Sequence, residues 1–244
     1  MKRLIFAVVA MIGAAAQAIG AGPAVDFTTV GSMTTFNSAQ HDTANVGGIK
    51  IDGFVYTGGT TYRKDEGFLW LRNNPDDHGL GYCSSGETCG PVNSTGNGDW
   101  NELSNQNKHE VIRLTLPTGA GMHWTDIWVS SLDSGGTSNN ETGTVFWSNI
   151  AKPNLNTLTT KTTFSYNQIA PADERSIFAL LGINPFAKYL FFEAGPSGTN
   201  NDYLLYGANF VSPVPEPESY VMLLAGLALM GFVARRRKRN DAVL

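Results

Sequence analysis

Short runs of alternating apolar and polar residues fill the middle of the chain, and this pattern predicts β-strands rather than helices. A period of two places apolar side chains on one face of a strand and polar ones on the other. In residues 110–116, Ile112 and Leu114 share one face while Val111 and Arg113 share the other, as expected of a half-buried strand. The predicted strands are residues 48–57, 67–72, 110–116, 122–132, 144–147, 162–166, 189–194 and 203–211. Residues 176–181 fit a short helix or a further strand.

These strands predict an all-β body over residues 19–212. Clusters of Gly, Asn, Ser and Thr separate the strands and are typical of turns. A segment of this length is large enough for one sizeable core and too short for two comfortable domains. Eight or nine such strands fit a single two-sheet β-sandwich of jelly-roll type.

The N-terminus has the three parts of a secretory signal peptide. Lys2 and Arg3 supply positive charge, residues 4–16 form an apolar run, and Ala16-Gln17-Ala18 supplies small residues for signal peptidase. The apolar run is too short for a retained transmembrane helix. We therefore expect residues 1–18 to be removed on export, with cleavage after Gly20 or Ala21 as the alternatives.

Export places the two cysteines of the chain, Cys83 and Cys89, in an oxidising compartment. They lie in a stretch rich in Gly, Ser and Asn that reads as a loop, and their close spacing predicts a local disulfide. A zinc site needs further ligands, and the nearest histidine, His78, does not match the usual spacing.

The C-terminus combines a tether, an apolar segment and a basic cluster. Pro213, Pro215 and Pro217 oppose helix and strand pairing and predict an extended tether. Residues 220–234 are apolar and as a helix span roughly 22 Å, short of the ~30 Å hydrocarbon core. A basic cluster on the cytoplasmic side halts export. We expect this membrane stop at Arg235, Arg236, Arg237, Lys238 and Arg239, directly after a single transmembrane anchor helix.

Residues 213–239 together resemble the PEP-CTERM sorting signal of Gram-negative bacteria. The resemblance is carried by Val214, Pro215, Glu216 and Pro217, followed by the apolar segment and the Arg-rich end. It implies processing near Pro215-Glu216-Pro217 by an exosortase, an integral membrane transpeptidase with a cysteine nucleophile. It also implies delivery to the outer surface, often in bacteria that make extracellular polysaccharide. The chain is then a substrate of that enzyme.

The charge of the body excludes some partners. The formal net charge of −4 includes basic residues at both ends, and the ten basic and eighteen acidic residues between positions 19 and 212 leave −8. Such a body repels nucleic acid and anionic lipid headgroups.

No catalytic motif stands out, so two functions from different classes remain open. The first is a non-catalytic surface protein that binds polysaccharide, with Trp100, Glu102 and Asp133 as candidate ligand residues. The second is a secreted glycoside hydrolase or lyase acting on exopolysaccharide, with its acids among Glu102, Glu110 and Asp133. A hydrolase needs two carboxyl groups about 5–9.5 Å apart in a cleft.

Other loop and aromatic residues have two interpretations each. One acidic loop group could bind calcium weakly together with backbone carbonyls: Asp76, Asp77 and Asp99. Acidic residues in loops are more often solvated, so we expect no metal or cofactor. The many aromatic rings either stack on sugars from an exposed face or fill the core. They include Trp70, Trp100, Trp124, Trp128, Trp147, Tyr56, Tyr62 and Tyr82.

Overall fold

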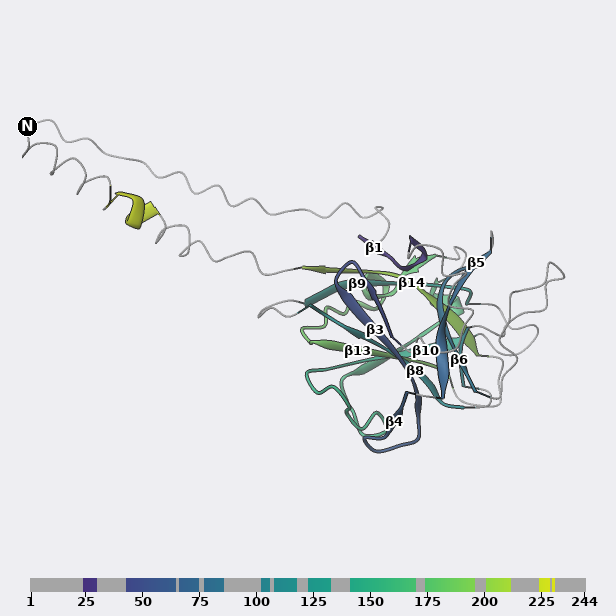
Figure 1. The fold of residues 1–244 in the computed structure, drawn as a ribbon. Coiled ribbons are helices and arrows are strands. Elements are labelled where there is room, and N and C mark those ends of the chain that lie inside the picture. Colours follow the sequence, from purple (N-terminus) through teal and green to yellow (C-terminus); the bar gives the residue numbers. More distant parts are fainter. Residues whose placement is uncertain are drawn as a thin grey trace, which may run out of the picture.

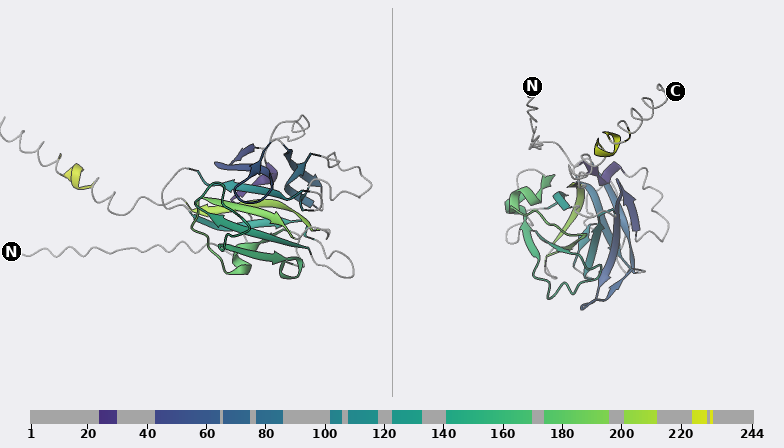
Figure 2. Two further views of the ribbon diagram at one scale, coloured as in Figure 1. Left: turned by 90° about the horizontal axis from the view of Figure 1, so that it is seen from below. Right: turned by 90° about the vertical axis from the view of Figure 1, so that its left-hand side faces the viewer.

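The computed structural model describes the body as two antiparallel β-sheets packed in layers (Figures 1 and 2). The described residues are 24–29, 43–64, 66–74, 77–85, 102–105, 108–117, 123–132, 141–169, 174–195, 201–211, 224–228 and 230. Three short helical turns accompany the sheets: η1 (Phe27–Thr29), α1 (Tyr166–Ile169) and α2 (Ile177–Leu181).

The first sheet has the order β12-β9-β14-β6-β5, and β1 and β7 also pair with β14. Its strands are β1 (Val25–Asp26), β5 (Gly67–Asn74), β6 (Asp77–Ser84), β7 (Leu103–Ser104), β9 (His123–Ser130), β12 (Arg175–Ser176) and β14 (Asp202–Val211). The last strand of the body, β14, therefore lies in the middle of this sheet and runs directly into the predicted tether.

The second sheet has the order β11-β10-β13-β8-β3-β2, with β4 paired to β3. Its strands are β2 (Thr43–Val46), β3 (Ile49–Tyr56), β4 (Tyr62–Arg63), β8 (Glu110–Thr115), β10 (Thr142–Ser148), β11 (Lys161–Ser165) and β13 (Tyr189–Ala194). The all-β prediction is confirmed, and the finer jelly-roll assignment stays a prediction.

One hydrophobic core joins the two sheets. Ile51 and Leu114 from the second sheet are buried in one cluster with Leu80 and Leu205 from the first. The alternation of apolar residues explains this, because every second side chain of each strand points between the sheets.

A second hydrophobic cluster covers the outer face of the second sheet. It consists of Phe54, Tyr56, Tyr62, Val111, Phe146, Leu155 and Phe191. The segment between β10 and β11 lies over it, since Tyr62 Oη donates to the Pro153 carbonyl at 2.7 Å and the Leu155 amide donates to Tyr56 Oη at 3.1 Å. The prediction that β8 is half-buried is therefore wrong, because the first sheet covers one face of β8 and the segment between β10 and β11 covers the other.

The eight predicted strands are all present, with ends that differ by a few residues. Residues 176–181 form the helical turn α2 rather than a longer strand. The long strand β6 was not predicted, because Gly79 and Gly81 resemble loop residues. Gly79 packs against β14, where an added Cβ would lie 2.7 Å from Leu204 Cβ, so the close approach of two strands requires a glycine there.

Candidate functional site

The parts of the chain that carry the export and sorting predictions lie mostly outside the described residues. These parts are residues 1–18, the motif Val214 to Pro217, and the basic cluster Arg235 to Arg239. Within residues 220–234, residues 224–228 and 230 are helical, and Leu224, Leu227 and Met230 expose their apolar side chains to solvent.

None of the helices in the described part of the chain has the length and apolar character needed to cross a membrane.

Cys83 lies in β6 and is fully buried, which corrects the prediction that it belongs to a loop. No cysteine among the described residues is a free thiol. Cys89 lies outside the described residues, so the disulfide between the two stays a prediction.

Glu102 is the one candidate ligand residue that the structure describes, because Trp100 and Asp133 lie outside the described residues. Its side chain is buried, and its Oε1 accepts a hydrogen bond from Ser131 Oγ at 2.8 Å. Ser131 follows β9 with a φ of 59°, a left-handed conformation that is uncommon for serine. The structure therefore brings Glu102 beside the segment that leads to Asp133.

Glu110, a candidate acid for hydrolysis, holds three strands together. It is fully buried at the start of β8, its Oε1 accepts the Ser84 amide of β6 at 2.8 Å, and its Oε2 accepts the Ser104 amide of β7 at 2.9 Å. Both carboxylate oxygens thus satisfy backbone donors that would otherwise be buried without partners.

The calcium alternative is only partly described. Asp77 opens β6, but its side chain, Asp76 and Asp99 lie outside the described part of the chain. Among the residues that are described, no three His, Cys, Asp or Glu side chains gather as a metal site. The calcium candidates therefore stay a prediction.

Several of the aromatic side chains fill the core, as one of the two interpretations predicted. Trp124, Tyr56, Tyr62 and Tyr82 are buried, and Trp147 packs against the main core. Trp70 and Trp128 are partly buried. None of these four buried rings is available to stack on a sugar.

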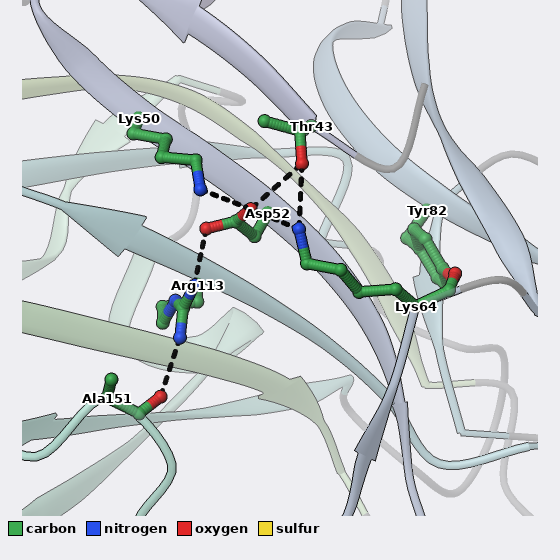
Figure 3. A network of polar contacts seen from close by, with 7 residues as sticks. All are labelled: Thr43, Lys50, Asp52, Lys64, Tyr82, Arg113 and Ala151. Carbon is green, nitrogen blue, oxygen red and sulfur yellow. Dashed lines mark hydrogen bonds and ion pairs between the residues drawn. The ribbon is translucent and has the colours of Figure 1, made fainter. Parts of the chain in front are cut away.

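A buried charge network on the outer face of the second sheet was not predicted (Figure 3). Asp52 on β3 is fully buried and lies directly opposite Arg113 on β8. Arg113 Nη2 donates to Asp52 Oδ2 at 2.6 Å, and Arg113 Nη1 donates to the Ala151 carbonyl at 2.6 Å. Lys64 Nζ lies 2.7 Å and Lys50 Nζ 3.1 Å from Asp52 Oδ1. One carboxylate is thus surrounded by three cations.

The protonation of Asp52 follows from this geometry. Burial alone would raise the pKa of Asp52, but hydrogen bonds from Lys64 and Arg113, the charge of Arg113 and the Thr43 hydroxyl outweigh it. Together they hold the pKa of this carboxyl well below its usual range. Asp52 is therefore ionised at neutral pH.

Arg113 also packs against aromatic rings. Its guanidinium lies 4.9 Å from the Phe54 ring centroid and 5.5 Å from that of Tyr189. Lys188 Nζ lies 5.5 Å from the Tyr189 ring, and Lys161 Nζ lies 5.4 Å from the Phe146 ring. We call this cluster the basic face, defined as Lys50, Lys64, Arg113, Lys161 and Lys188.

The sequence contained a signal for the basic face that can be recognised in retrospect. Asp52 and Arg113 are charged residues in the middle of strands β3 and β8, at positions that alternate with the core residues Ile51 and Leu114. Charges at such positions within buried strands indicate a partner on the neighbouring strand. The pairing of β3 with β8 was needed to identify that partner.

The comparisons with known proteins agree with the sorting signal. Residues 213–238 match the family model of the PEP-CTERM protein-sorting motif. No match was found among curated proteins or among solved structures. The chain thus carries a C-terminal sorting signal of exported proteins. The match confirms the resemblance seen in the sequence, and a motif of this kind supports sorting by an exosortase and implies export to the cell envelope or surface.

Proposed function

We propose that this protein is a non-catalytic surface or matrix protein that binds extracellular polysaccharide through its β-sandwich body. Signal peptidase removes residues 1–18, and residues 220–234 then hold the chain in the inner membrane until an exosortase releases it to the surface. The observation that carries the sorting part of this proposal is the PEP-CTERM match at residues 213–238, which begins two residues after β14 ends at Val211.

The anchor is suited to a transient role. An apolar helix of 15 residues is short for the hydrocarbon core, and mismatch costs fractions of a kcal/mol per Å. The basic cluster that follows it is nevertheless sufficient to stop export. The prolines of the tether keep the segment next to the bilayer extended, so an enzyme can bind it as a strand.

The described acids of the body support a non-catalytic role. Glu110 uses both oxygens on backbone amides, and Glu102 is buried against Ser131. A glycoside hydrolase needs one carboxyl group free to donate a proton and a second free to attack or to activate water. Neither Glu102 nor Glu110 has that freedom.

Export also supports the disulfide. In an oxidising compartment, a buried Cys83 that is no free thiol is best explained by a bond to Cys89, the other cysteine of the chain. Closing such a short loop stabilises the fold by about 2–3 kcal/mol in the chain-entropy picture. Mass spectrometry of the exported protein under non-reducing conditions should show one Cys83–Cys89 linked peptide, and two alkylatable thiols would contradict it.

The sorting proposal is tested by changing the motif in a host that has an exosortase. Glu216→Ala or Pro217→Ala should leave export intact but retain full-length protein in the inner membrane. A matched control is Glu218→Ala, which removes the same charge just outside the motif and should be processed normally. Normal release of the Glu216→Ala and Pro217→Ala variants would contradict the proposal.

Removing residues 235–239 tests the membrane stop separately. Without these charges the apolar segment should pass through the membrane, and uncleaved protein should appear outside the inner membrane. If the shortened protein stays in the inner membrane, the basic cluster is not the stop.

A further inference from the structure

We propose that the basic face binds the acidic sugars of an anionic polysaccharide, such as uronate units, with Lys50, Lys188 and Tyr189 at its centre. This inference rests on the proposed function, because it names the ligand class and the location of the binding surface on the body.

Basic residues are concentrated on this one face of an otherwise acidic body. The body carries a net charge of −8 with ten basic residues, yet five of those ten lie on the basic face. The carboxylates described on the same face are Asp52 and Glu193, and Glu193 Oε2 lies 2.5 Å from His109 Nε2. An acidic protein with a local basic surface attracts a polyanion to that surface and repels it elsewhere.

The lysines of the basic face remain accessible, whereas Arg113 is buried beneath them. Lys50 and Lys64 expose 47% and 37% of their side chains, and Lys188 is exposed. Three cations share the single charge of Asp52, so its carboxylate cannot neutralise them. The face therefore keeps positive charge for a ligand.

Cations of the basic face lie around one partly exposed ring, that of Tyr189. Thr115 on β8 lies between Lys50 on β3 and Tyr189 on β13. These three residues therefore form one row on the outer face. Neighbouring strands lie about 4.8 Å apart, which places Lys50 and Tyr189 roughly 10 Å apart. Arg113 and Lys188 both lie 5.5 Å from the Tyr189 ring. The row thus offers several charges to successive acidic groups of a chain.

Residues of the covering segment border the row. The Ala151 carbonyl accepts from Arg113, the Asn149 side chain accepts from the Lys188 amide, and Ile150 between them is exposed. Among the described residues, the buried Arg113 Nε and Thr115 Oγ1 beside this row have no hydrogen-bond partner. Buried polar atoms without partners are uncommon and indicate bound water at this position. The exposed lysine charges favour an acidic glycan over a neutral one.

The test compares two double variants of the full-length protein, purified in mild detergent. Lys50→Gln with Lys188→Gln removes two charges from the basic face. Arg63→Gln with Lys108→Gln removes two charges that both pair with Glu66, and it serves as the matched control. Arg63 pairs with Val55, about 17 Å along β3 from Lys50. Equal melting temperatures show that both variants fold as the wild type does.

Binding is measured by titration calorimetry with polygalacturonate and with neutral dextran, at low and at physiological salt. We expect the wild type to prefer polygalacturonate and to lose affinity as salt rises. The Lys50/Lys188 variant should bind it about tenfold more weakly, and the control less than twofold.

The outcomes separate this inference from the proposed function. Equal losses in both double variants, or salt-independent binding of dextran as tight as that of polygalacturonate, would overturn the basic-face inference but keep polysaccharide binding. Binding of free galacturonate without the polymer would assign the face to a small anion and also overturn it. Binding of neither polysaccharide would overturn polysaccharide binding as well, while leaving exosortase sorting intact.

Discussion

Asp52 on β3 and Arg113 on β8 form a buried ion pair on the outer face of the second sheet, with 2.6 Å between Asp52 Oδ2 and Arg113 Nη2. Arg113 extends the contact to the Ala151 carbonyl, in the segment that covers the outer hydrophobic cluster. The pair thus links two strands and the segment that lies over them. It also fixes the position of the cations at the centre of the basic face.

Asp52→Asn should destabilise the body by about 3 kcal/mol, because it leaves the buried Arg113 charge without a counter-charge. Urea unfolding measures the change. The matched control is Glu66→Gln, which removes a carboxylate from ion pairs at the surface and should change the free energy of unfolding far less than Asp52→Asn does. Equal effects of the two variants would show that the Asp52 pair contributes no more than a surface contact.

The same pair predicts how acid affects the wild type. The folded-state pKa of Asp52 lies below the unfolded value of about 3.9, so its contribution is fully present above that value. It is lost as the pH falls below about 4 towards the folded-state pKa. The difference in unfolding free energy between wild type and Asp52→Asn should therefore be constant from pH 5 to 7 and shrink below pH 4. A difference that grows on acidification would contradict this assignment.

Glu110→Ala should cost roughly 2–4 kcal/mol, because the amides of Ser84 and Ser104 lose their buried acceptor. Glu110→Gln keeps one acceptor oxygen and should recover part of the loss. Thermal unfolding measures both changes. If Glu110→Gln left stability unchanged but abolished release of sugars from a polysaccharide, Glu110 would be a catalytic acid and the non-catalytic proposal would be wrong.

The all-β body could be predicted because alternation in segments such as 110–116 reports directly on which side chains face a core. The covered outer face could not, because the contacts of Tyr62 with Pro153 and of Leu155 with Tyr56 join residues far apart in sequence. Strand β6 was missed for a related reason. Its glycine at position 79 is required by the neighbouring β14, and single-sequence patterns do not report on neighbours.

The candidate sites, too, could be predicted only where their signal is local in the sequence. The sorting signal was predictable because its proline-rich, apolar and basic parts follow one another directly in the sequence, and the family match at residues 213–238 confirms it. Glu110 was a reasonable catalytic candidate by residue type, but its two backbone donors come from β6 and β7. The basic face was missed because Lys50 lies on β3, Arg113 on β8 and Lys188 directly before β13, and these strands meet only in the folded sheet.

The measurement that tests the sorting account most directly is a fractionation blot of the wild-type protein with one tag before Pro213 and a second after Arg239. The host has an exosortase, and a matched strain without it is the control. We expect the first tag alone at the cell surface or in the medium, and both tags together in the inner membrane of the control strain. If the two tags remain on one chain at the surface of the exosortase-bearing host, the signal is not processed and residues 220–234 are a permanent anchor.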